Sequence, residues 1–298
     1  MFDFLASFFS PMLAAFSTFP LLFVAVAGGL GLLVGSFLNV VIHRLPVMMR
    51  QEWREQCAWL DGKTLEAASP YNIFVPRSAC PSCKHLITWY ENIPLLSWLL
   101  LKGRCSDCGT PISKRYPLVE LLTGVLFAYA AWHWGVGMQT VLVWGLLASL
   151  VALSFIDFDT QMLPDSITLP LAWAGLLVNM NGVFCSLEEA VIGAVAGYLA
   201  LWSVFHLFKM LTGKEGMGFG DFKLLAALGA WLGWKMILPI VLSASFVGAL
   251  IGITLILFAG RDRAQPMPFG PWLALGGVIA LFWGEPIVRI WLGAAGAM

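Results

Sequence analysis

Two acidic residues in this sequence lie where long apolar segments meet polar ones, and acids in that position are the best candidates for chemistry. Asp157 follows the apolar run 151–156, and Asp221 comes shortly before another run that begins at Leu224. A carboxylate at a membrane boundary is costly to desolvate, which favours a functional role for it. The simpler interpretation of Asp221 is a helix cap, because Asp is a favoured N-cap residue.

Asp221 lies in a glycine-rich stretch, Gly216-Met-Gly-Phe-Gly-Asp-Phe-Lys223. The glycines, Gly218 and Gly220 among them, let the backbone bend and approach a substrate closely. Lys223 follows Asp221 by two residues, so on a helix the two side chains would point about 200° apart. We expect Lys223 either to act as a cation that holds the acids or a substrate carboxylate, or to anchor the helix among lipid headgroups.

We expect Asp157 and Asp221 to meet, because counting membrane crossings places both at one membrane surface. Two carboxylates at close range cannot both ionise, so they share a proton. The ionised member can take a proton from water, and the protonated member can donate to a carbonyl oxygen. That is peptide hydrolysis without a covalent intermediate. The alternative is two unrelated acids in interfacial loops.

Two further acids near Asp157 are weaker candidates for the pair. Asp159 would lie about 200° around a helix from Asp157 and begins a polar turn. Asp165 follows Pro164, where the N-cap of the next helix is expected. Asp157 directly continues the apolar run, so its carboxylate is the one we expect inside the bundle.

Four cysteines form the second pattern that indicates chemistry, Cys80-Pro-Ser-Cys83 and Cys105-Ser-Asp-Cys108. The two pairs are separated by 21 residues, close to the spacing of known zinc knuckles. Four thiolates close a tetrahedral Zn²⁺ site and leave no position for water, so the predicted zinc is structural. Two disulfides are the alternative, which a reducing cytoplasm disfavours.

The composition shows the setting in which these residues must be positioned. Hydrophobic residues make up 59% of the 298 residues and charged residues 11%, whereas globular chains carry about 25% charged residues. This predicts an integral membrane protein. The formal net charge is zero, so nothing indicates a nucleic-acid partner. Residues 1–20 lack a basic start, and we expect no cleavable signal peptide there.

Eight apolar segments are candidates to cross the membrane, which takes about 20 residues. We expect an all-α polytopic membrane protein with about eight transmembrane helices and a small cytoplasmic zinc-ribbon-like insert after the first helix. The segment 224–234 is short and is predicted to be tilted or re-entrant. The candidate spans are residues 19–42, 118–133, 138–156, 166–178, 189–210, 224–234, 236–260 and 269–291.

The chain accordingly divides into three predicted parts. Residues 1–42 hold an N-terminal segment and the first transmembrane helix, in which glycines at 28, 29, 31 and 35 allow close helix packing. Residues 43–117 form the zinc-binding insert. Residues 118–298 form a membrane-embedded aspartic peptidase domain.

The distribution of basic residues predicts the orientation. Ten of the 17 Lys and Arg residues lie between Arg44 and Arg115, and basic loops stay in the cytoplasm. Later basic residues support this placement. Lys209 and Lys214 fall on the cytoplasmic side, as do Arg261 and Arg263 if 224–234 crosses. Only Lys235 and Arg289 fall outside.

The stretch Gly218–Lys223 resembles the GxGD signature of membrane aspartic peptidases. It resembles more closely the GxGDxK form of that signature, which is found in bacterial type IV prepilin peptidases. Further segments resemble the same family in the same order, at residues 35–46, 80–108, 91–98, 116–120 and 157–165. GxGD alone is a weak signal, whereas this ordered set is specific.

The resemblance implies a bifunctional enzyme of the bacterial inner membrane. It would cleave the basic leader from type IV prepilins and type II secretion pseudopilins at the cytoplasmic face. It would then methylate the new N-terminal residue with S-adenosylmethionine. Asp157 and Asp221 carry over as the catalytic pair, supported by Gly218, Gly220 and Lys223. The zinc ligands carry over to Cys80, Cys83, Cys105 and Cys108.

The sequence names no residues for the methyl donor, because no G-x-G-x-x-G follows a predicted strand. Three alternatives remain open at this point. The first is a transporter or channel, which would need further acids deep in the spans. The second is a membrane scaffold of a pilus or secretion system, and the third is a peptidase without methyl transfer.

Overall fold

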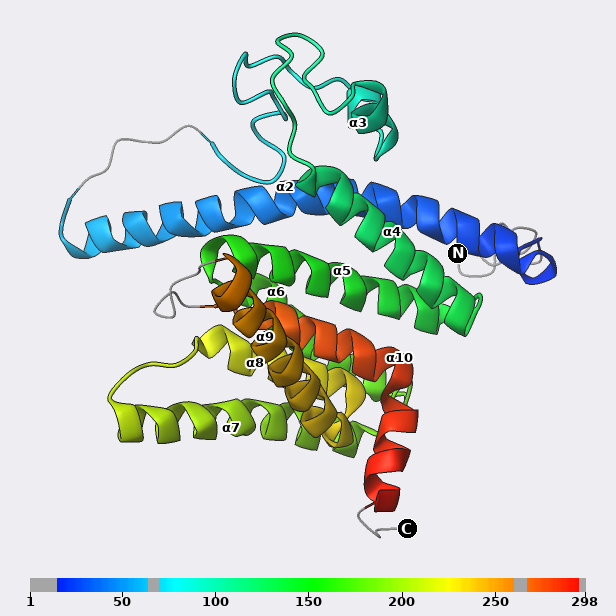
Figure 1. The fold of residues 1–298 in the computed structure, drawn as a ribbon, viewed down its shortest axis with the longest axis vertical. Coiled ribbons are helices and arrows are strands. Elements are labelled where there is room, and N and C mark those ends of the chain that lie inside the picture. Colours follow the sequence, from blue (N-terminus) through cyan, green and yellow to red (C-terminus); the bar gives the residue numbers. More distant parts are fainter. Residues whose placement is uncertain (1–14, 64–69, 260–266, 295–298) are drawn as a thin grey trace. The chain divides into compact units, whose positions relative to one another are not determined.

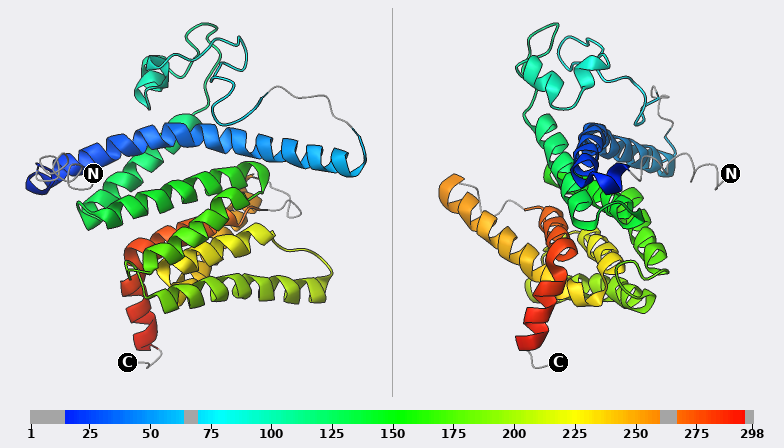
Figure 2. Two further views of the ribbon diagram at one scale, coloured as in Figure 1. Left: turned by 180° about the vertical axis from the view of Figure 1, so that it is seen from behind. Right: turned by 90° about the vertical axis from the view of Figure 1, so that its right-hand side faces the viewer.

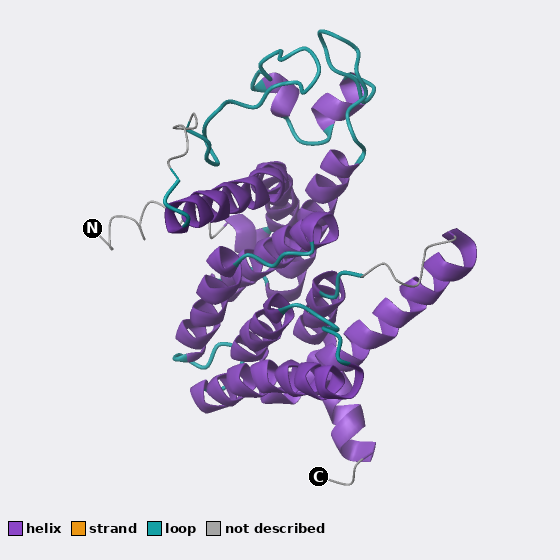
Figure 3. Cartoon of the chain, turned by 90° about the vertical axis from the view of Figure 1, so that its left-hand side faces the viewer, coloured by secondary structure: helices purple, strands orange, loops and turns teal. Residues whose placement is uncertain are grey.

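A computed structural model describes residues 15–63, 70–259 and 267–294. These residues form helices and loops without a named strand, and two isolated β-bridges lie among them (Figures 1 and 3). The all-α class is thus confirmed for the described residues. Two expectations from the sequence lie partly or wholly outside them, the absence of a signal peptide in residues 1–20 and the placement of Arg261 and Arg263.

In chain order, the helices of the described residues are α2 (Pro20–Leu60), η1 (Tyr90–Asn92), α3 (Leu96–Leu100), α4 (Arg115–Trp134), α5 (Met138–Thr160), α6 (Asp165–Asn179), α7 (Leu187–Thr212), α8 (Phe219–Leu232), η2 (Trp234–Met236), α9 (Ile237–Ala259) and α10 (Gly270–Ala294).

Five of the described helical segments are long and apolar enough to cross a membrane, which makes this a multi-pass membrane protein. They are Pro20–Leu60, Met138–Thr160, Leu187–Thr212, Trp234–Phe258 and Gly270–Ile290. Helices α4, α6 and α8 do not meet the same test. Helices α6 and α8 have only 15 and 14 residues, so the expected eight crossings are not confirmed by length and composition.

The chain splits into two compact units, Met1–Ala152 and Leu153–Met298, and α5 runs across the boundary. In the first unit, α2 packs closely on α4. A Cβ atom on Gly31 would lie 2.8 Å from the Cα atom of Gly124, and one on Gly35 would lie 2.7 Å from the Cα atom of Glu120. Glycines therefore set this helix contact, as expected, although a Cβ on Gly29 would meet nothing within 4 Å.

Helix α2 continues well past residue 42, where we expected the first helix to end. It passes through Pro46 and ends at Leu60. Pro46 removes one helix hydrogen bond, but the residues after it are mostly good helix formers. They also support the helix locally, since Gln51 Nε2 donates to Glu55 Oε1 at 3.0 Å. The polar segment therefore begins as a helical extension.

In the second unit, α8 is packed by α6, α7 and α10 (Figure 2). Its residues Leu224, Leu225, Ala227 and Leu228 are fully buried. A Cβ atom on Gly193 of α7 would lie only 2.3 Å from the carbonyl oxygen of Gly229. The sides of this short helix that carry these buried residues therefore contact other parts of the protein.

The far end of α8 is fixed by a buried amide side chain. Asn179 Nδ2 donates to the carbonyl oxygens of Ala230 and Trp231 at 2.8 and 2.9 Å. Its Oδ1 accepts from the amides of Phe184 and Cys185 at 3.0 and 3.2 Å. These bonds satisfy carbonyls that the end of α8 leaves without helix partners, and they join α8 to the end of α6.

Candidate active site and metal site

The second unit brings Asp157 and Asp221 together. Asp157 lies near the end of α5 and Asp221 in the first turn of α8, and they are 5% and 6% exposed. Their carboxylates are close enough for the charge of Asp157 to act on Asp221. The two acids selected from the sequence therefore form a buried pair contributed by two helices.

Asp157 is positioned by the end of α5 and by the start of α10. The amide of Gln161, which has a positive φ of 54°, donates to the carbonyl oxygen of Asp157 at 2.9 Å as the helix ends. The backbone amide of Gly270 donates to Asp157 Oδ2 at 3.0 Å. Nearby, Phe158 packs edge-on against Trp272 with ring centroids 5.8 Å apart.

Asp221 is positioned by the start of α8. Gly218 is the N-cap residue, and the amide of Asp221 donates to its carbonyl oxygen at 3.3 Å. An acid in the first turn of a helix is favoured by the positive end of the helix dipole. Asp221 is thus an acid of the first turn and not the N-cap itself, which excludes the simpler interpretation weighed above.

Leu163 lies between two glycines beside the acid pair. A Cβ atom on Gly220 would lie 2.7 Å from Leu163 Cβ, and one on Gly270 would lie 3.1 Å from Leu163 Cδ1. Gly220 is therefore required for close approach and not for an unusual backbone conformation. Gly218 has open space by comparison, with Asp221 Oδ2 at 3.9 Å from its hypothetical Cβ.

Lys223 forms an ion pair with Asp165. Its Nζ lies 2.7 and 2.6 Å from the two carboxylate oxygens. The expectation that Asp165 caps α6 is wrong, because the N-cap residue is Pro164 and Asp165 is the first helical residue. The Lys223–Asp165 ion pair joins the start of α8 to the start of α6. The third acid of this region, Asp159, is exposed.

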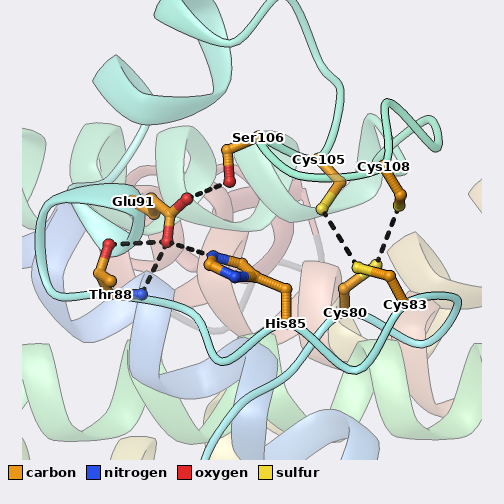
Figure 4. A network of polar contacts seen from close by, with 8 residues as sticks. All are labelled: Cys80, Cys83, His85, Thr88, Glu91, Cys105, Ser106 and Cys108. Carbon is orange, nitrogen blue, oxygen red and sulfur yellow. Dashed lines mark hydrogen bonds and ion pairs between the residues drawn. The ribbon is translucent and has the colours of Figure 1, made fainter.

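The four cysteines of the insert have the spacing of a tetrahedral metal site. Their sulfur atoms all lie within 4.8 Å of one another. Cys80 and Cys108 are 3.8 Å apart, and Cys83 and Cys105 are 3.9 Å apart (Figure 4). Ligands at the usual Zn–S length of about 2.3 Å would be about 3.8 Å apart. All four thiols are free, so the geometry fits a metal and not two disulfides.

The insert contains the same turn twice. The amide of Cys80 donates to His85 O at 2.8 Å, and the amide of Cys105 donates to Thr110 O at 2.9 Å. In both turns the backbone has positive φ just after the second cysteine, at Lys84 (63°) and at Gly109 (69°). This repeated conformation places the four sulfur atoms toward one point.

A carboxylate joins the two cysteine turns (Figure 4). Glu91 Oε2 accepts from the amide and hydroxyl of Thr88 at 2.8 and 2.6 Å and contacts His85 Nε2 at 3.2 Å. Its Oε1 accepts from the hydroxyl of Ser106. The hydrogen bonds from Ser106 and Thr88 lower the pKa of Glu91 to about 2. Glu91 therefore stays ionised at neutral pH and holds both turns.

Comparisons with known proteins show which family the chain belongs to. The model of the "Bacterial Peptidase A24 N-terminal domain" matches residues 30–134, and that of the "Type IV leader peptidase family" matches residues 144–253. The chain belongs to the type IV leader peptidase family. No solved structure matches it.

Several relatives in this family are similar along nearly their whole length, and each is named "Prepilin leader peptidase/N-methyltransferase". The relative from Stutzerimonas stutzeri is 54% identical over 92% of this chain and 95% of its own. The relative from Aeromonas hydrophila is also 54% identical, with the same coverage. The relative from Pseudomonas aeruginosa is 52% identical over 96% of this chain and 99% of its own.

Sequence reasoning missed three features of the site in this family member. It did not identify Gly270, which holds Asp157, or Leu163, which fills the space between the glycines. It also did not pair Lys223 with Asp165. The only local signal at Gly270 is the Pro that follows it, which favours a helix start and says nothing about a carboxylate.

Glu91 provides a test of how the metal site is organised. We expect wild-type protein to bind about one Zn²⁺ per chain and the double variant Cys80→Ser/Cys83→Ser to lose it. Glu91→Gln should weaken zinc affinity by about 10–100-fold, because partners that orient metal ligands have effects of that size. Competition with a chelator measures the zinc affinity. Glu52→Gln on the exposed side of α2 is the matched control, and unchanged affinity in Glu91→Gln would contradict the assignment.

Proposed function

We propose that Asp157 and Asp221 are the catalytic pair of a membrane aspartic peptidase. The observation that carries this proposal is two buried carboxylates, from α5 and α8, close enough to interact. The start of a helix faces each of them, since Asp221 lies in the first turn of α8 and Gly270 opens α10 beside Asp157. Helix N-termini stabilise negative charge, so the pair can hold one ionised and one protonated acid.

The pair performs general acid–base catalysis. The ionised carboxylate takes a proton from a water molecule whose oxygen bonds to the scissile carbonyl carbon, while the protonated carboxyl donates to the carbonyl oxygen. The carbon–nitrogen bond then breaks: the leaving amine takes a proton from the pair, and the former carbonyl oxygen returns its proton to the pair as the C=O double bond re-forms. One proton remains shared at the end, as at the start. Burial supports this chemistry, because charge interactions are stronger where water is excluded.

Family membership, together with the name that the relatives share, assigns to the chain the cleavage of prepilin leaders and the N-methylation that follows. We propose that the substrates are type IV prepilins and type II secretion pseudopilins, cut after a basic leader. S-adenosylmethionine supplies the methyl group when bound, and the described residues show no set that we assign to it.

The metal proposed for the insert is Zn²⁺ in a structural role. Four thiolates are the donor set that zinc prefers in closed tetrahedral sites. Contacts with the side chain and backbone of Thr110 lower the pKa of the Cys108 thiol to about 6, and deprotonated thiols are the species that bind metal. The site holds the insert together and supplies no coordination position for catalysis.

The proposed topology has eight crossings, with the acid pair and the zinc insert at the cytoplasmic side of the bacterial inner membrane. Helices α4, α6 and α8 supply the three crossings beyond the five candidate spans. A helix of 14 or 15 residues is about 22 Å long, less than the hydrocarbon core. Helix α8 can still cross, because α6, α7 and α10 pack around it.

The catalytic assignment is tested by four single replacements. Asp157→Asn and Asp221→Asn should each abolish cleavage of a prepilin while the protein still inserts, because an amide cannot exchange the proton. Asp159→Asn should retain substantial activity and serves as the control, and Asp165→Asn should be intermediate. Mass spectrometry of the new N-terminus reads cleavage and methylation in one spectrum. Normal cleavage by Asp157→Asn with loss in Asp159→Asn or Asp165→Asn would overturn the assignment.

The Lys223–Asp165 ion pair predicts a charge-reversal rescue. Asp165→Lys and Lys223→Asp should each reduce cleavage, because like charges would force apart the starts of α6 and α8. The double variant should recover most of the loss. The effect on thermal stability should stay within about 1 kcal/mol, as for other partly exposed pairs. If the double variant is as poor as the worse single variant, the pair does not position the site.

The topology is tested by cysteine labelling in a background that lacks Cys57 and Cys185. Gln161→Cys and Glu215→Cys should react with a membrane-impermeant maleimide only after the membrane is opened. Met180→Cys, between α6 and α7, should react in intact spheroplasts. Labelling of all three from the same side would show that α6 and α7 do not cross, and the eight-span topology would fail.

A further inference from the structure

The start of α10 makes a direct bond to the catalytic pair. The backbone amide of Gly270 donates to Asp157 Oδ2 over 3.0 Å, in a buried contact between residues 113 positions apart. This hydrogen bond joins α10 to the end of α5. A buried bond to a charged acceptor is worth more than one between neutral groups.

The other amides in the first turn of α10 are used elsewhere. Pro271 has no N–H group, and the amides of Trp272 and Leu273 both donate to the carbonyl oxygen of Phe269 at 3.1 Å. Gly270 is therefore the residue of this turn whose amide reaches Asp157. Through that amide the positive end of the α10 dipole also faces the carboxylate.

The position requires glycine because of space. A Cβ atom on Gly270 would lie 2.7 Å from Asp157 Oδ2 and 3.1 Å from both Cδ atoms of Leu163. The first distance is too short for any real Cβ contact, so alanine would push the carboxylate away from the amide. The backbone of Gly270 has no positive φ, so alanine meets no backbone penalty.

We propose that the amide of Gly270 positions Asp157 as the ionised, proton-accepting member of the acid pair. A hydrogen bond from a backbone amide to a carboxylate oxygen favours the charged form of that carboxylate. Asp221 then carries the shared proton and donates it to the carbonyl oxygen of the substrate. Gly270 is a positioning residue, and the inference rests on the catalytic pair proposed above.

The charged groups around Asp157 are few in the described part of the chain. Asp221 faces it from α8, and the Lys223–Asp165 ion pair stands at the starts of α8 and α6. Helix α9 has no charged residue. The charged residues of α10, Glu285 and Arg289, pair with each other in its last turns.

Asp221 receives its backbone contact from its own helix. The backbone of Gly218, the N-cap of α8, bonds to the Asp221 carboxyl, but no described residue of another helix donates to it as Gly270 donates to Asp157 over 3.0 Å. The bond from α10 therefore favours Asp157 as the ionised member and leaves Asp221 as the proton donor.

The test is the pH dependence of prepilin cleavage by Gly270→Ala in purified full-length protein. Cleavage at neutral pH should fall about tenfold or more, and the acidic limb of the kcat/KM profile should move up by about one pH unit. That is the size expected for the loss of one hydrogen bond to a charged group. Gly145→Ala is the matched control, because this helical glycine in α5 has nothing within 4 Å of its hypothetical Cβ. Its profile should equal that of the wild type.

A second variant separates positioning from packing. Leu163→Ala/Gly270→Ala relieves the crowding of Leu163 but keeps the new methyl group against Asp157, so it should show the same shift of the acidic limb. This variant also decides the question if Gly270→Ala alone does not fold. The inference would be overturned if both variants kept the pH profile of the wild type, or if they lost activity while the acidic limb of the profile stayed in place. Full activity in Asp157→Asn and Asp221→Asn would instead refute the catalytic pair itself.

Discussion

Burying two carboxylates side by side is the constraint on which the second unit depends. Taking one ion out of water costs several kcal/mol even after the surroundings relax, and a second like charge nearby adds repulsion. The cost is reduced by sharing one proton and by placing helix starts at the acids, with Asp221 in the first turn of α8 and the Gly270 amide on Asp157. Both helix starts can act on the acids only if backbone atoms lie very close to the carboxylates.

Glycines allow such close approach at both ends of α8. At the acid end, Gly220 and Gly270 leave room for Leu163 and for the carboxylate. Near the other end, Gly193 and Gly229 let α7 and α8 approach until a Cβ on either would lie 2.2–2.3 Å from the other's carbonyl oxygen. Asn179 then ties the last carbonyls of α8 to α6. Helix α8 is fixed at both ends, so the position of Asp221 is determined by packing and not by the loop before it.

The sequence was sufficient to select Asp157 and Asp221, because an acid at the end of an apolar run is costly to desolvate and is therefore rare without a functional role. The sequence was also sufficient to select the four cysteines, because their spacing is a local pattern. The partners of these residues were not predictable in the same way. Gly270 lies 113 positions from Asp157 and Lys223 lies 58 positions from Asp165, and contacts over such separations leave no periodic signal. The length of α2 was missed because Pro46 and the charged residues after it looked like the end of a helix.

The remaining membrane-side acids bear on which function the fold can support. A proton or cation path would need further acids free to act within the spans. In the first unit, Glu120 is the candidate, and its carboxylate accepts the amide of Leu95 at 2.8 Å, which ties the zinc insert to α4. At the end of α10, Glu285 pairs with Arg289 on the exposed surface. These acids are held in structural contacts, whereas Asp157 and Asp221 face each other. That difference favours hydrolysis at one pair over transport along a series of acids.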